Sequence, residues 1–237
     1  MDFKVIHIEE TDSTNRWLRE CTCHNGGRIC VVAAYQTAGR GCGTNSWESE
    51  RGKNLTFSVL IHPEEIPANR QFHITEIASV AVCETLKTFG LQDVSIKWPN
   101  DIYVGDRKIC GMLLENRLQG SVIKDSIIGI GLNVNQQVFT SDAPNPVSLY
   151  QLLGHETSLE LVLDTFLQAF DKAYNSKTIC FAYREMLYRK GKDYLYKTKT
   201  TCFTARLTGV TDEGRLCLVD EQGQERFFAF KEVQFII

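Results

Sequence analysis

Lys97, Asn100 and Asp101 are grouped around a proline in the segment KWPNDIYVGDRKICG, residues 97–111. Pro99 fixes its own φ angle and favours an extended conformation for the residue before it. The side chains of Lys97 and Asn100 are therefore expected to point in fixed directions. A rigid turn that carries a cation, an amide and a carboxylate has no evident packing role. This favours a site that handles anions.

A second lysine of this segment is expected to lie beside the turn. Gly105 and Asp106 form a plausible tight turn, so the flanking residues are predicted to form a hairpin. Asp101 and Lys108 then lie on neighbouring strands, about where cross-strand partners meet. A structural ion pair is one interpretation, and on an exposed surface it would contribute under about 1 kcal/mol to stability. The other is that the cations bind an anionic substrate.

The glycine-rich loop TAGRGCGTNSW, residues 37–47, is another candidate for chemistry. Gly39, Gly41 and Gly43 allow the backbone to approach a ligand closely, and Arg40 is a cation held between them. The loop lacks the G-K-[ST] of a Walker loop, and its last residues do not read as the helix start of a dinucleotide-binding motif. A surface turn that happens to hold an arginine explains the loop equally well.

Gly129 and Gly131 interrupt an otherwise β-branched strand that ends in GIGLNVN. Glycines weaken a strand, and one usual reason for them is a ligand that lies against the backbone. Room for a neighbouring helix is an equally good reason. Asn133 offers an amide that suits an adenine edge or a ribose.

Ser13, Thr14 and Asn15 stand at the start of a predicted helix. Helix capping is the ordinary role of such residues. The same hydroxyls and backbone N–H groups could also bind the polar, uncharged part of a ligand. The histidines show no metal-ligand spacing, and the sequence has no G-x-S-x-G motif of a serine hydrolase.

Strands and helices that alternate along the chain are expected to position these residues, before a β-rich C-terminus. Apolar periodicity predicts helices over 13–24, 68–89, 158–175 and 179–191, with the longest at 68–89. Strands are predicted over 3–8, 28–36, 54–61 and 121–135, besides the hairpin. The strand over 28–36 should be buried on both faces, and the alternating strand over 54–61 half-exposed. After Asp193, short strands separated by turns suit a small barrel of SH3 type, which predicts two domains, 1–190 and 191–237.

The composition is that of an ordinary globular protein of 237 residues, with 43% hydrophobic residues and a net charge of -3. This charge gives no general attraction to nucleic acid, so duplex DNA is not an expected partner. The charged start is no signal sequence and no apolar run is long enough to span a membrane, so a cytoplasmic location is expected. The nine cysteines are scattered and form no C-x-x-C pair, so we expect them to be reduced and mostly in the core.

The segments DSTN, YQTAGRG, KWPNDIYVGDRKICG and GIGLNVN resemble, in order and spacing, the catalytic domain of biotin protein ligases. The C-terminal strands resemble the last domain of that family, so the likeness covers essentially the whole chain. It implies an α+β fold of the class II aminoacyl-tRNA synthetase/biotin synthetase type, with helices on one face of a mixed sheet and a C-terminal SH3-like barrel. Relatives that double as repressors carry an N-terminal DNA-binding domain. This chain begins at the first catalytic strand, so the resemblance implies a monofunctional ligase.

The resemblance implies that Mg-ATP activates biotin to biotinyl-5'-AMP, and that the acyl group then passes to a lysine of a biotin carboxyl carrier domain. Two anions must meet, so well-placed cations must offset their repulsion. By resemblance, the catalytic residues are Arg40, Asp101 and Lys108. Biotin would be bound by Ser13, Thr14, Asn15, Gln36, Arg40, Gly41, Cys42, Lys108, Gly111, Gly129 and Gly131. ATP would be bound by Arg40, Trp47, Lys97, Asn100, Asp101 and Asn133, with Mg²⁺ near Asn100 and Asp101.

The loop departs from the family pattern, because Cys42, Gly43 and Thr44 replace the usual arginine or glutamine and glycine after GRG. We expect this change to loosen retention of the adenylate. Glycine content also predicts that the loop closes over a ligand like a lid. Two other functions stay open: a lipoate or octanoate ligase of the same fold, and a non-catalytic biotin or nucleotide sensor that dimerises through a sheet edge.

Overall fold

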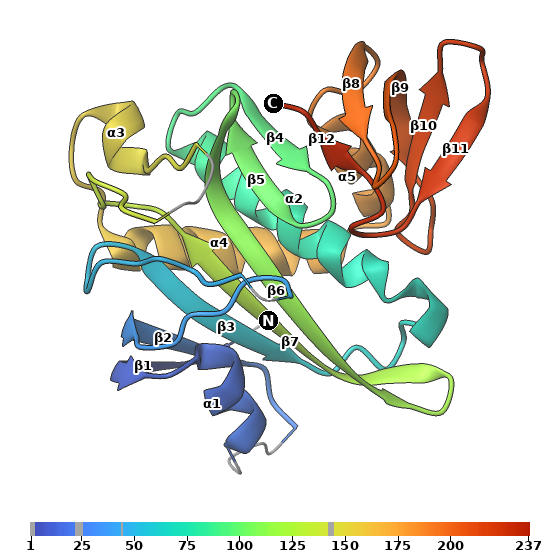
Figure 1. Ribbon diagram of the computed structural model, residues 1–237. Coiled ribbons are helices and arrows are strands. Elements are labelled where there is room, and N and C mark those ends of the chain that lie inside the picture. Colours follow the sequence, from blue (N-terminus) through green and yellow to red (C-terminus); the bar gives the residue numbers. More distant parts are fainter. Residues whose placement is uncertain (1–2, 22–25, 44, 142–144) are drawn as a thin grey trace.

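The computed structural model describes residues 3–21, 26–43, 45–141 and 145–237 and contains two β-sheets (Figure 1). The strands of the large sheet are β1 (Lys4–Thr11), β2 (Ile29–Gln36), β3 (Leu55–Ile61), β4 (Val94–Lys97), β5 (Asp101–Val104), β6 (Arg107–Gln119) and β7 (Val122–Leu132). Those of the C-terminal sheet are β8 (Asp193–Lys197), β9 (Cys202–Val210), β10 (Leu216–Asp220), β11 (Glu225–Phe228) and β12 (Gln234–Phe235). The helices are α1 (Thr14–Glu20), the 3-10 helix η1 (Ala68–Arg70), α2 (Phe72–Thr88), α3 (Leu149–Leu153), α4 (Leu159–Tyr174) and α5 (Ile179–Glu185).

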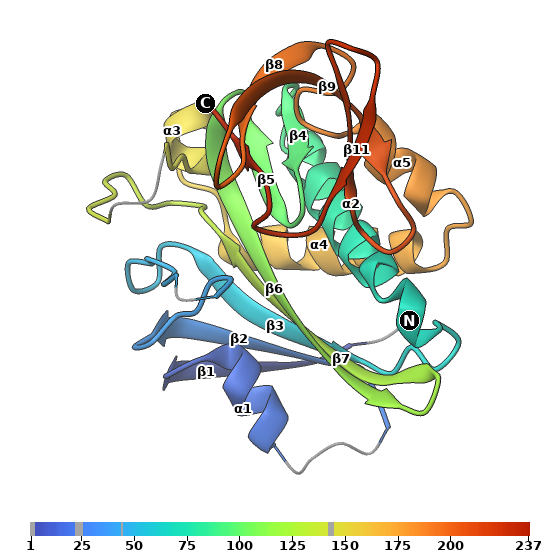
Figure 2. The same cartoon turned by 45° about the vertical axis from the view of Figure 1, so that its right-hand side comes forward.

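The large sheet is mixed, with the strand order β1-β2-β3-β7-β6-β5-β4. β1 runs parallel to β2, and the other neighbouring strands pair antiparallel. Figure 2 shows the long β6–β7 hairpin crossing the molecule between β3 and the shorter β5 and β4. α2 and α4 pack together on one face of the sheet, and the short α1 lies against β3 and β7 on the other (Figures 1 and 2). The predicted α+β class with a mixed sheet is confirmed.

β3 is buried along its whole length, so the prediction of a half-exposed strand is wrong. Four of its apolar side chains belong to the core that α2 and α4 cover, whereas Leu60 packs with Leu18 of α1 and Ser58 bonds Asn15 of the same helix. There, Ser58 Oγ donates to Asn15 Oδ1 at 2.6 Å, and Thr56 Oγ1 donates to the carbonyl of Ala33 at 3.0 Å. A helix of seven residues thus buries the face that alternation assigned to solvent.

Two helices are shorter than predicted, although the helix expected over 68–89 forms as η1 and α2 and is the longest. α1 ends at Glu20, and the end predicted near residue 24 lies outside the described residues. α5 ends at Glu185. Ser13 is the N-cap of α1 but makes no side-chain capping bond, so the capping interpretation is not supported. Within the described ranges, none of the helices has the length and apolar character of a membrane span.

The C-terminal sheet, in the order β11-β10-β9-β8-β12, joins the large sheet through the turn between β9 and β10. Trp98 Nε1 donates to the carbonyl of Gly214 in this turn at 3.0 Å. Asp212, in the same turn, pairs with Arg70 at 3.0 Å and with Arg184 at 3.2 Å. The predicted division at residue 190, and the SH3 type of the C-terminal part, stay predictions.

The cysteines differ from expectation in two respects, because one described cysteine is not reduced and most of them are not in the core. Cys21 is disulfide-bonded, so the expectation of reduced cysteines is wrong there. The other described cysteines are free, but only Cys30, Cys83 and Cys110 are fully buried. Cys23 lies outside the described residues.

Candidate functional site

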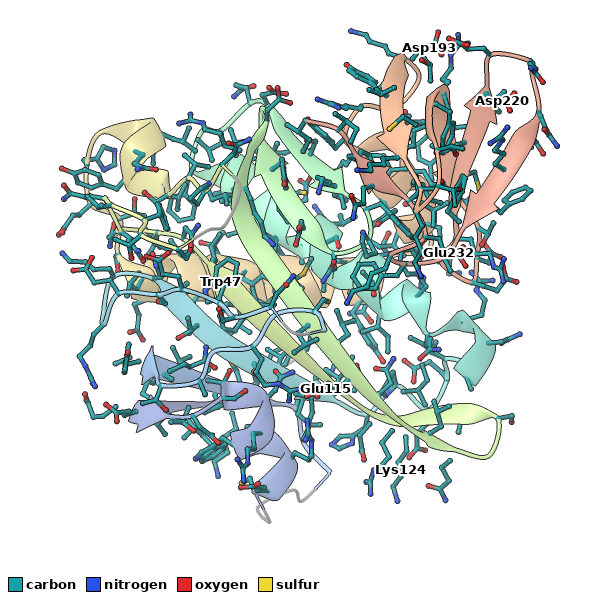
Figure 3. All side chains as sticks on the ribbon, viewed as in Figure 1. Trp47, Glu115, Lys124, Asp193, Asp220 and Glu232 are labelled. Carbon is teal, nitrogen blue, oxygen red and sulfur yellow. The ribbon has the colours of Figure 1, made fainter. Side chains whose placement is uncertain are left out.

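A cavity of about 990 Å³ opens over the large sheet, and every residue that the sequence analysis assigned to biotin, ATP or catalysis lines it. These residues come from the start of α1, from β2 and the loop after it, from the turn between β4 and β5, and from β6 and β7. Figure 3 places Trp47 over the middle of the sheet. The structure therefore gathers into one place segments that are up to 120 residues apart, from Ser13 to Asn133.

At one end of the cavity, the lining side chains from the start of α1 and the end of β2 are polar and uncharged. Thr14 donates through both its backbone N–H and its hydroxyl to Gln36 Oε1, at 2.8 and 3.1 Å. The Ser58 hydroxyl lies 2.7 Å from Thr14 Oγ1 and 2.6 Å from Asn15 Oδ1. Asn15 Nδ2 then donates to the carbonyl of Leu113 at 3.2 Å and to Glu115 Oε2, outside the cavity lining, at 3.0 Å. This network fixes the Thr14 and Asn15 side chains, which suits recognition of a neutral group that both donates and accepts hydrogen bonds.

Ser58 is a positioning residue that sequence reasoning missed. Its side chain is fully buried and bonds both Thr14 and Asn15, but it does not line the cavity itself. The alternating pattern of β3 assigned it to solvent, so no local signal identified it. Only the packing of α1 on this face brings Ser58 into the network.

In the middle of the cavity, Trp47 and Asn15 pack closely against the backbone of three glycines. A Cβ on Gly131 would overlap the Trp47 indole, and a Cβ on Gly129 would overlap the Asn15 amide. At Gly111, a Cβ would stand 3.0 Å from Trp47 Cζ3. Trp47 Nε1 is buried and has no hydrogen-bond partner among the described residues. An orphaned buried donor of this kind costs about 1–3 kcal/mol unless a ligand or water accepts from it.

Asn133 lines the same cavity and is almost fully buried. Its Nδ2 donates to the carbonyl of Val147 at 3.1 Å, whereas its Oδ1 has no partner among the described residues. Trp47 Nε1 is therefore a free donor and Asn133 Oδ1 a free acceptor among the described residues, and a ligand in the cavity could bond to both.

The other end of the cavity carries a cluster of positive side chains on the β4–β5–β6 segment. Lys108 Nζ pairs with Asp101 Oδ1 at 2.7 Å, and both side chains are about three-quarters buried. Lys97 Nζ has no ion-pair partner among the described residues and lies 5.1 Å from the centre of the Tyr103 ring. Burial lowers the pKa of Lys97. The expected juxtaposition of Asp101 and Lys108 is present.

Asn100 and Asp101 have the donor atoms that a magnesium ion takes. The Nδ2 of Asn100 bonds the carbonyl of Met112 and lies 3.0 Å from Cys42 Sγ, so its Oδ1 remains as an oxygen ligand. Asp101 adds a carboxylate. Magnesium is commonly held by one or two protein oxygens together with substrate phosphates and waters. These two residues fit such a site.

The loop after β2 is tied back on itself and to the sheet. Gly41 N–H donates to the carbonyl of Asn45 at 2.8 Å, and Trp47 N–H donates to the carbonyl of Gly39 at 3.0 Å. Arg40, with half of its side chain exposed, lies 3.5 Å from the carboxylate of Glu115 on β6. Figure 3 shows Glu115 farther along the sheet than Trp47. Closure of the loop over a ligand stays a prediction.

The C-terminal sheet supplies a wall of the cavity that sequence reasoning did not assign, namely Phe230, Lys231, Val233, Gln234 and Phe235. Lys231 has a left-handed backbone, with φ at 68°, and its ammonium reaches the backbone of Gly43 in the glycine loop. It makes no ion pair with any described residue. The residues around Lys231 in the sequence do not predict its place in the cavity wall, because Lys231 and Gly43 are more than 180 residues apart in the chain.

Comparisons with known proteins agree with this geometry. The biotin/lipoate A/B protein ligase family matches residues 8–133. The bifunctional ligase/repressor BirA of Bacillus spizizenii is 30% identical, and the match covers 95% of this chain and 72% of that protein. The biotin–[acetyl-CoA-carboxylase] ligase of Paracoccus denitrificans is 27% identical, with 92% of this chain and 95% of that protein covered.

A solved structure of the biotin protein ligase from Aquifex aeolicus, in complex with biotin and ATP, superposes with a TM-score of 0.81 at 26% identity. The match covers 98% of this chain and 99% of that one. The family match and the similarity to these relatives show that the chain belongs to the biotin/lipoate A/B protein ligase family.

Proposed function

We propose that this protein is an ATP-dependent ligase that converts biotin to biotinyl-5'-AMP and transfers the biotinyl group to a lysine of a biotin carboxyl carrier domain. The observation that carries the proposal is the cavity itself, which has polar, uncharged side chains at one end, the ammonium groups of Lys97 and Lys108 at the other, and three glycines between them. The Aquifex relative was solved with biotin and ATP, which supports the same two ligands here.

The neutral end suits the ureido ring of biotin. A ureido group has one carbonyl acceptor and two N–H donors, and the network around Thr14, Asn15 and Gln36 offers both kinds of partner. The apolar chain of biotin would then run along the backbone of Gly129, Gly131 and Gly111. Asn15 and Trp47 lie against these glycines, so a side chain at any of the three positions would push them into the space that the biotin chain would occupy.

The cationic end allows the first half-reaction. A biotin carboxylate oxygen attacks the α-phosphorus of ATP, the bond to the bridging oxygen breaks, and pyrophosphate leaves. Lys108 and Arg40 lower the repulsion between the two anions, and Lys97 and Lys231 face the polyphosphate. When bound at Asn100 and Asp101, Mg²⁺ would supply further positive charge to the phosphate oxygens.

The second half-reaction is acyl transfer. A neutral lysine amine of the carrier domain attacks the acyl carbon, AMP leaves, and an amide forms. Lys108 would hold the developing negative charge on the acyl oxygen, and Asp101 would orient the incoming amine and take up its proton. The 2.7 Å contact between these side chains supports joint action on one reaction centre.

Two assignments of partners extend the proposal. The acceptor is the carrier domain of a biotin-dependent carboxylase. β1, an edge of the large sheet, is the candidate surface for a homodimer, because an edge strand presents unpaired backbone groups.

The test is ATP–pyrophosphate exchange by the purified protein with Mg²⁺. Exchange that requires biotin, and that lipoate and octanoate do not support, is the expected result. Exchange with lipoate or octanoate in place of biotin would replace this function by that of the related ligases. Binding of biotin or ATP without exchange would favour the non-catalytic sensor.

A further inference from the structure

We propose that His73, Glu76 and Cys180 form a binding site for a transition-metal ion of the zinc class, outside the ligand cavity. Their ligand atoms, Nδ1, a carboxylate oxygen and Sγ, all lie within 4.8 Å of one another. The first two turns of α2 supply the imidazole and the carboxylate, and α5 supplies the thiol. None of the three residues lines the cavity, and the ligase chemistry has no role for them.

The distances among the three atoms come close to those of a zinc site. Cys180 Sγ lies 3.4 Å from His73 Nδ1 and 3.0 Å from Glu76 Oε2, and these last two atoms are 2.8 Å apart. Bonds of about 2.0–2.3 Å in a tetrahedral site place ligand atoms roughly 3.4–3.6 Å apart. The sulfur–imidazole distance already agrees. The Glu76 carboxylate must withdraw by about half an ångström, as one side-chain torsion allows.

The charges at this place also favour a cation. The Glu76 side chain is only 4% exposed, and the one basic side chain within ion-pair distance of it among the described residues is His73, which carries a charge only when it is protonated. A buried carboxylate needs such compensation. A zinc ion would displace the thiol proton to solvent, form a sulfur–metal bond, and bring positive charge beside Glu76.

The ligand set selects the class of metal. A thiolate, an imidazole and one carboxylate suit Zn²⁺ far better than Mg²⁺ or Ca²⁺, which take oxygen ligands. The His73 side chain is about a quarter exposed, so solvent can reach the cluster and supply a fourth ligand. Arg70 lies 4.0 Å from Cys180 Sγ, but its charge is paired with Asp212 at 3.0 Å.

The position of the site predicts its effect. It ties the start of α2 to α5, directly beside the arginines that hold the β9–β10 turn of the C-terminal sheet. Metal binding should therefore stabilise the joint between the two sheets. It should leave the rate of biotin activation unchanged, because the cavity is built from other residues.

Cobalt titration of the full-length protein, freed of metal by a chelator and kept reduced, tests the site. The wild-type protein should bind one Co²⁺ with a sulfur-to-cobalt charge-transfer band and the intense visible bands of tetrahedral cobalt, and Zn²⁺ should abolish both. Cys180→Ser should lose the charge-transfer band. Loss of an outer-shell partner already costs about 10–100-fold in metal affinity, so loss of this ligand should cost at least about tenfold.

Cys202→Ser is the matched control, because Cys202 is an exposed free thiol on β9. It should keep the cobalt spectrum and the zinc-induced rise in Tm, and Cys180→Ser should lose that rise while its circular dichroism spectrum stays native. His73→Ala provides a second variant, expected to weaken cobalt binding with the charge-transfer band retained at saturation. A cobalt spectrum that is absent from the wild type, or unchanged in Cys180→Ser, would leave the three residues as a hydrogen-bonded cluster and overturn the proposal.

Discussion

Lys108 Nζ lies 2.7 Å from Asp101 Oδ1, across the strands β5 and β6. The pair is mostly shielded from water, at the cationic end of the cavity. An ion pair in such a place can exchange one partner for a substrate anion, because a biotin carboxylate would compete with Asp101 for the same ammonium group. Loss of the Lys108 ammonium should therefore impair biotin activation.

Lys108→Ala should lower the rate of biotin-dependent ATP–pyrophosphate exchange about 10²–10³-fold, the usual effect of removing one preorganised donor from a developing charge. The initial rate of exchange, measured at saturating ATP and biotin, gives the size of this effect. Lys124→Ala is the control, because Lys124 lies on β7 outside the cavity, near the far end of the β6–β7 hairpin (Figure 3). A Lys108→Ala protein that keeps the wild-type rate would remove Lys108 from the mechanism.

Gly129→Ala should weaken biotin binding about tenfold or more. The new Cβ would overlap the Asn15 amide, which must then give up its 2.6 Å bond to Ser58. Loss of a buried hydrogen bond costs about 1–3 kcal/mol. Isothermal titration with biotin measures the effect. Gly209→Ala, in β9, provides the comparison, since no atom lies within 4 Å of its new Cβ; equal affinities for the two variants would contradict the proposed biotin end.

Lys231→Ala and Lys231→Gly should both raise the KM for ATP, with little change in the KM for biotin. Each removes the ammonium group that the C-terminal sheet places against the glycine loop. The left-handed φ of 68° distinguishes the two variants, because only glycine adopts it without strain. Urea unfolding should find the glycine variant more stable than the alanine variant by about 1 kcal/mol.

Lys199→Ala, an exposed lysine in the turn between β8 and β9, is the control for Lys231. It should keep both KM values. An unchanged KM for ATP in both Lys231 variants would show that the C-terminal sheet contributes no charge to nucleotide binding.

Lys97→Met should make the folded protein more stable at neutral pH while it weakens ATP binding. Burial lowers the pKa of Lys97 below its ordinary value of 10.5, so the unfolded chain binds the proton more tightly than the folded one. The cost of burying the ammonium is fully present below the lowered pKa and disappears as the pH rises toward 10.5. The stability difference between Lys97→Met and the wild type should therefore shrink between neutral pH and about pH 10.

Urea unfolding at several pH values measures this difference, and Lys199→Met is the reference for replacing an exposed lysine. A difference that stays constant with pH would mean that the ammonium at position 97 carries no burial cost.

The sequence identified the cavity residues that lie in short motifs. Lys97, Asn100 and Asp101 were recognisable because a proline fixes the turn between them, and the resemblance to biotin protein ligases added the roles. Ser58 and Lys231 were not recognisable, because their places depend on contacts between distant segments. The role of Ser58 depends on α1, which packs against β3 and bonds its hydroxyl, and the role of Lys231 depends on the approach of the C-terminal sheet to the glycine loop.

The His73, Glu76 and Cys180 cluster shows the same limit. Helical periodicity places His73 and Glu76 one turn apart, but no pattern in the sequence announces a cysteine more than 100 residues later as their neighbour. The exposure of β3 was predicted wrongly for a related reason. The alternation of apolar and polar residues shows which side chains share a face of the strand, but whether another element packs on that face depends on the rest of the fold.

Cys42→Arg should retain the adenylate better than the wild-type protein does. Cys42 lies in the cavity wall with its sulfur 3.0 Å from Asn100 Nδ2, and burial raises the pKa of its thiol, so it is neutral at pH 7. A neutral thiol offers the adenylate phosphate no charge, whereas an arginine there would add a charged donor. In a single turnover without acceptor, less biotinyl-5'-AMP should escape from Cys42→Arg into solution. Cys202→Arg, the same exchange on exposed β9, should release as much as the wild type, and equal release by all three proteins would mean that position 42 does not control retention.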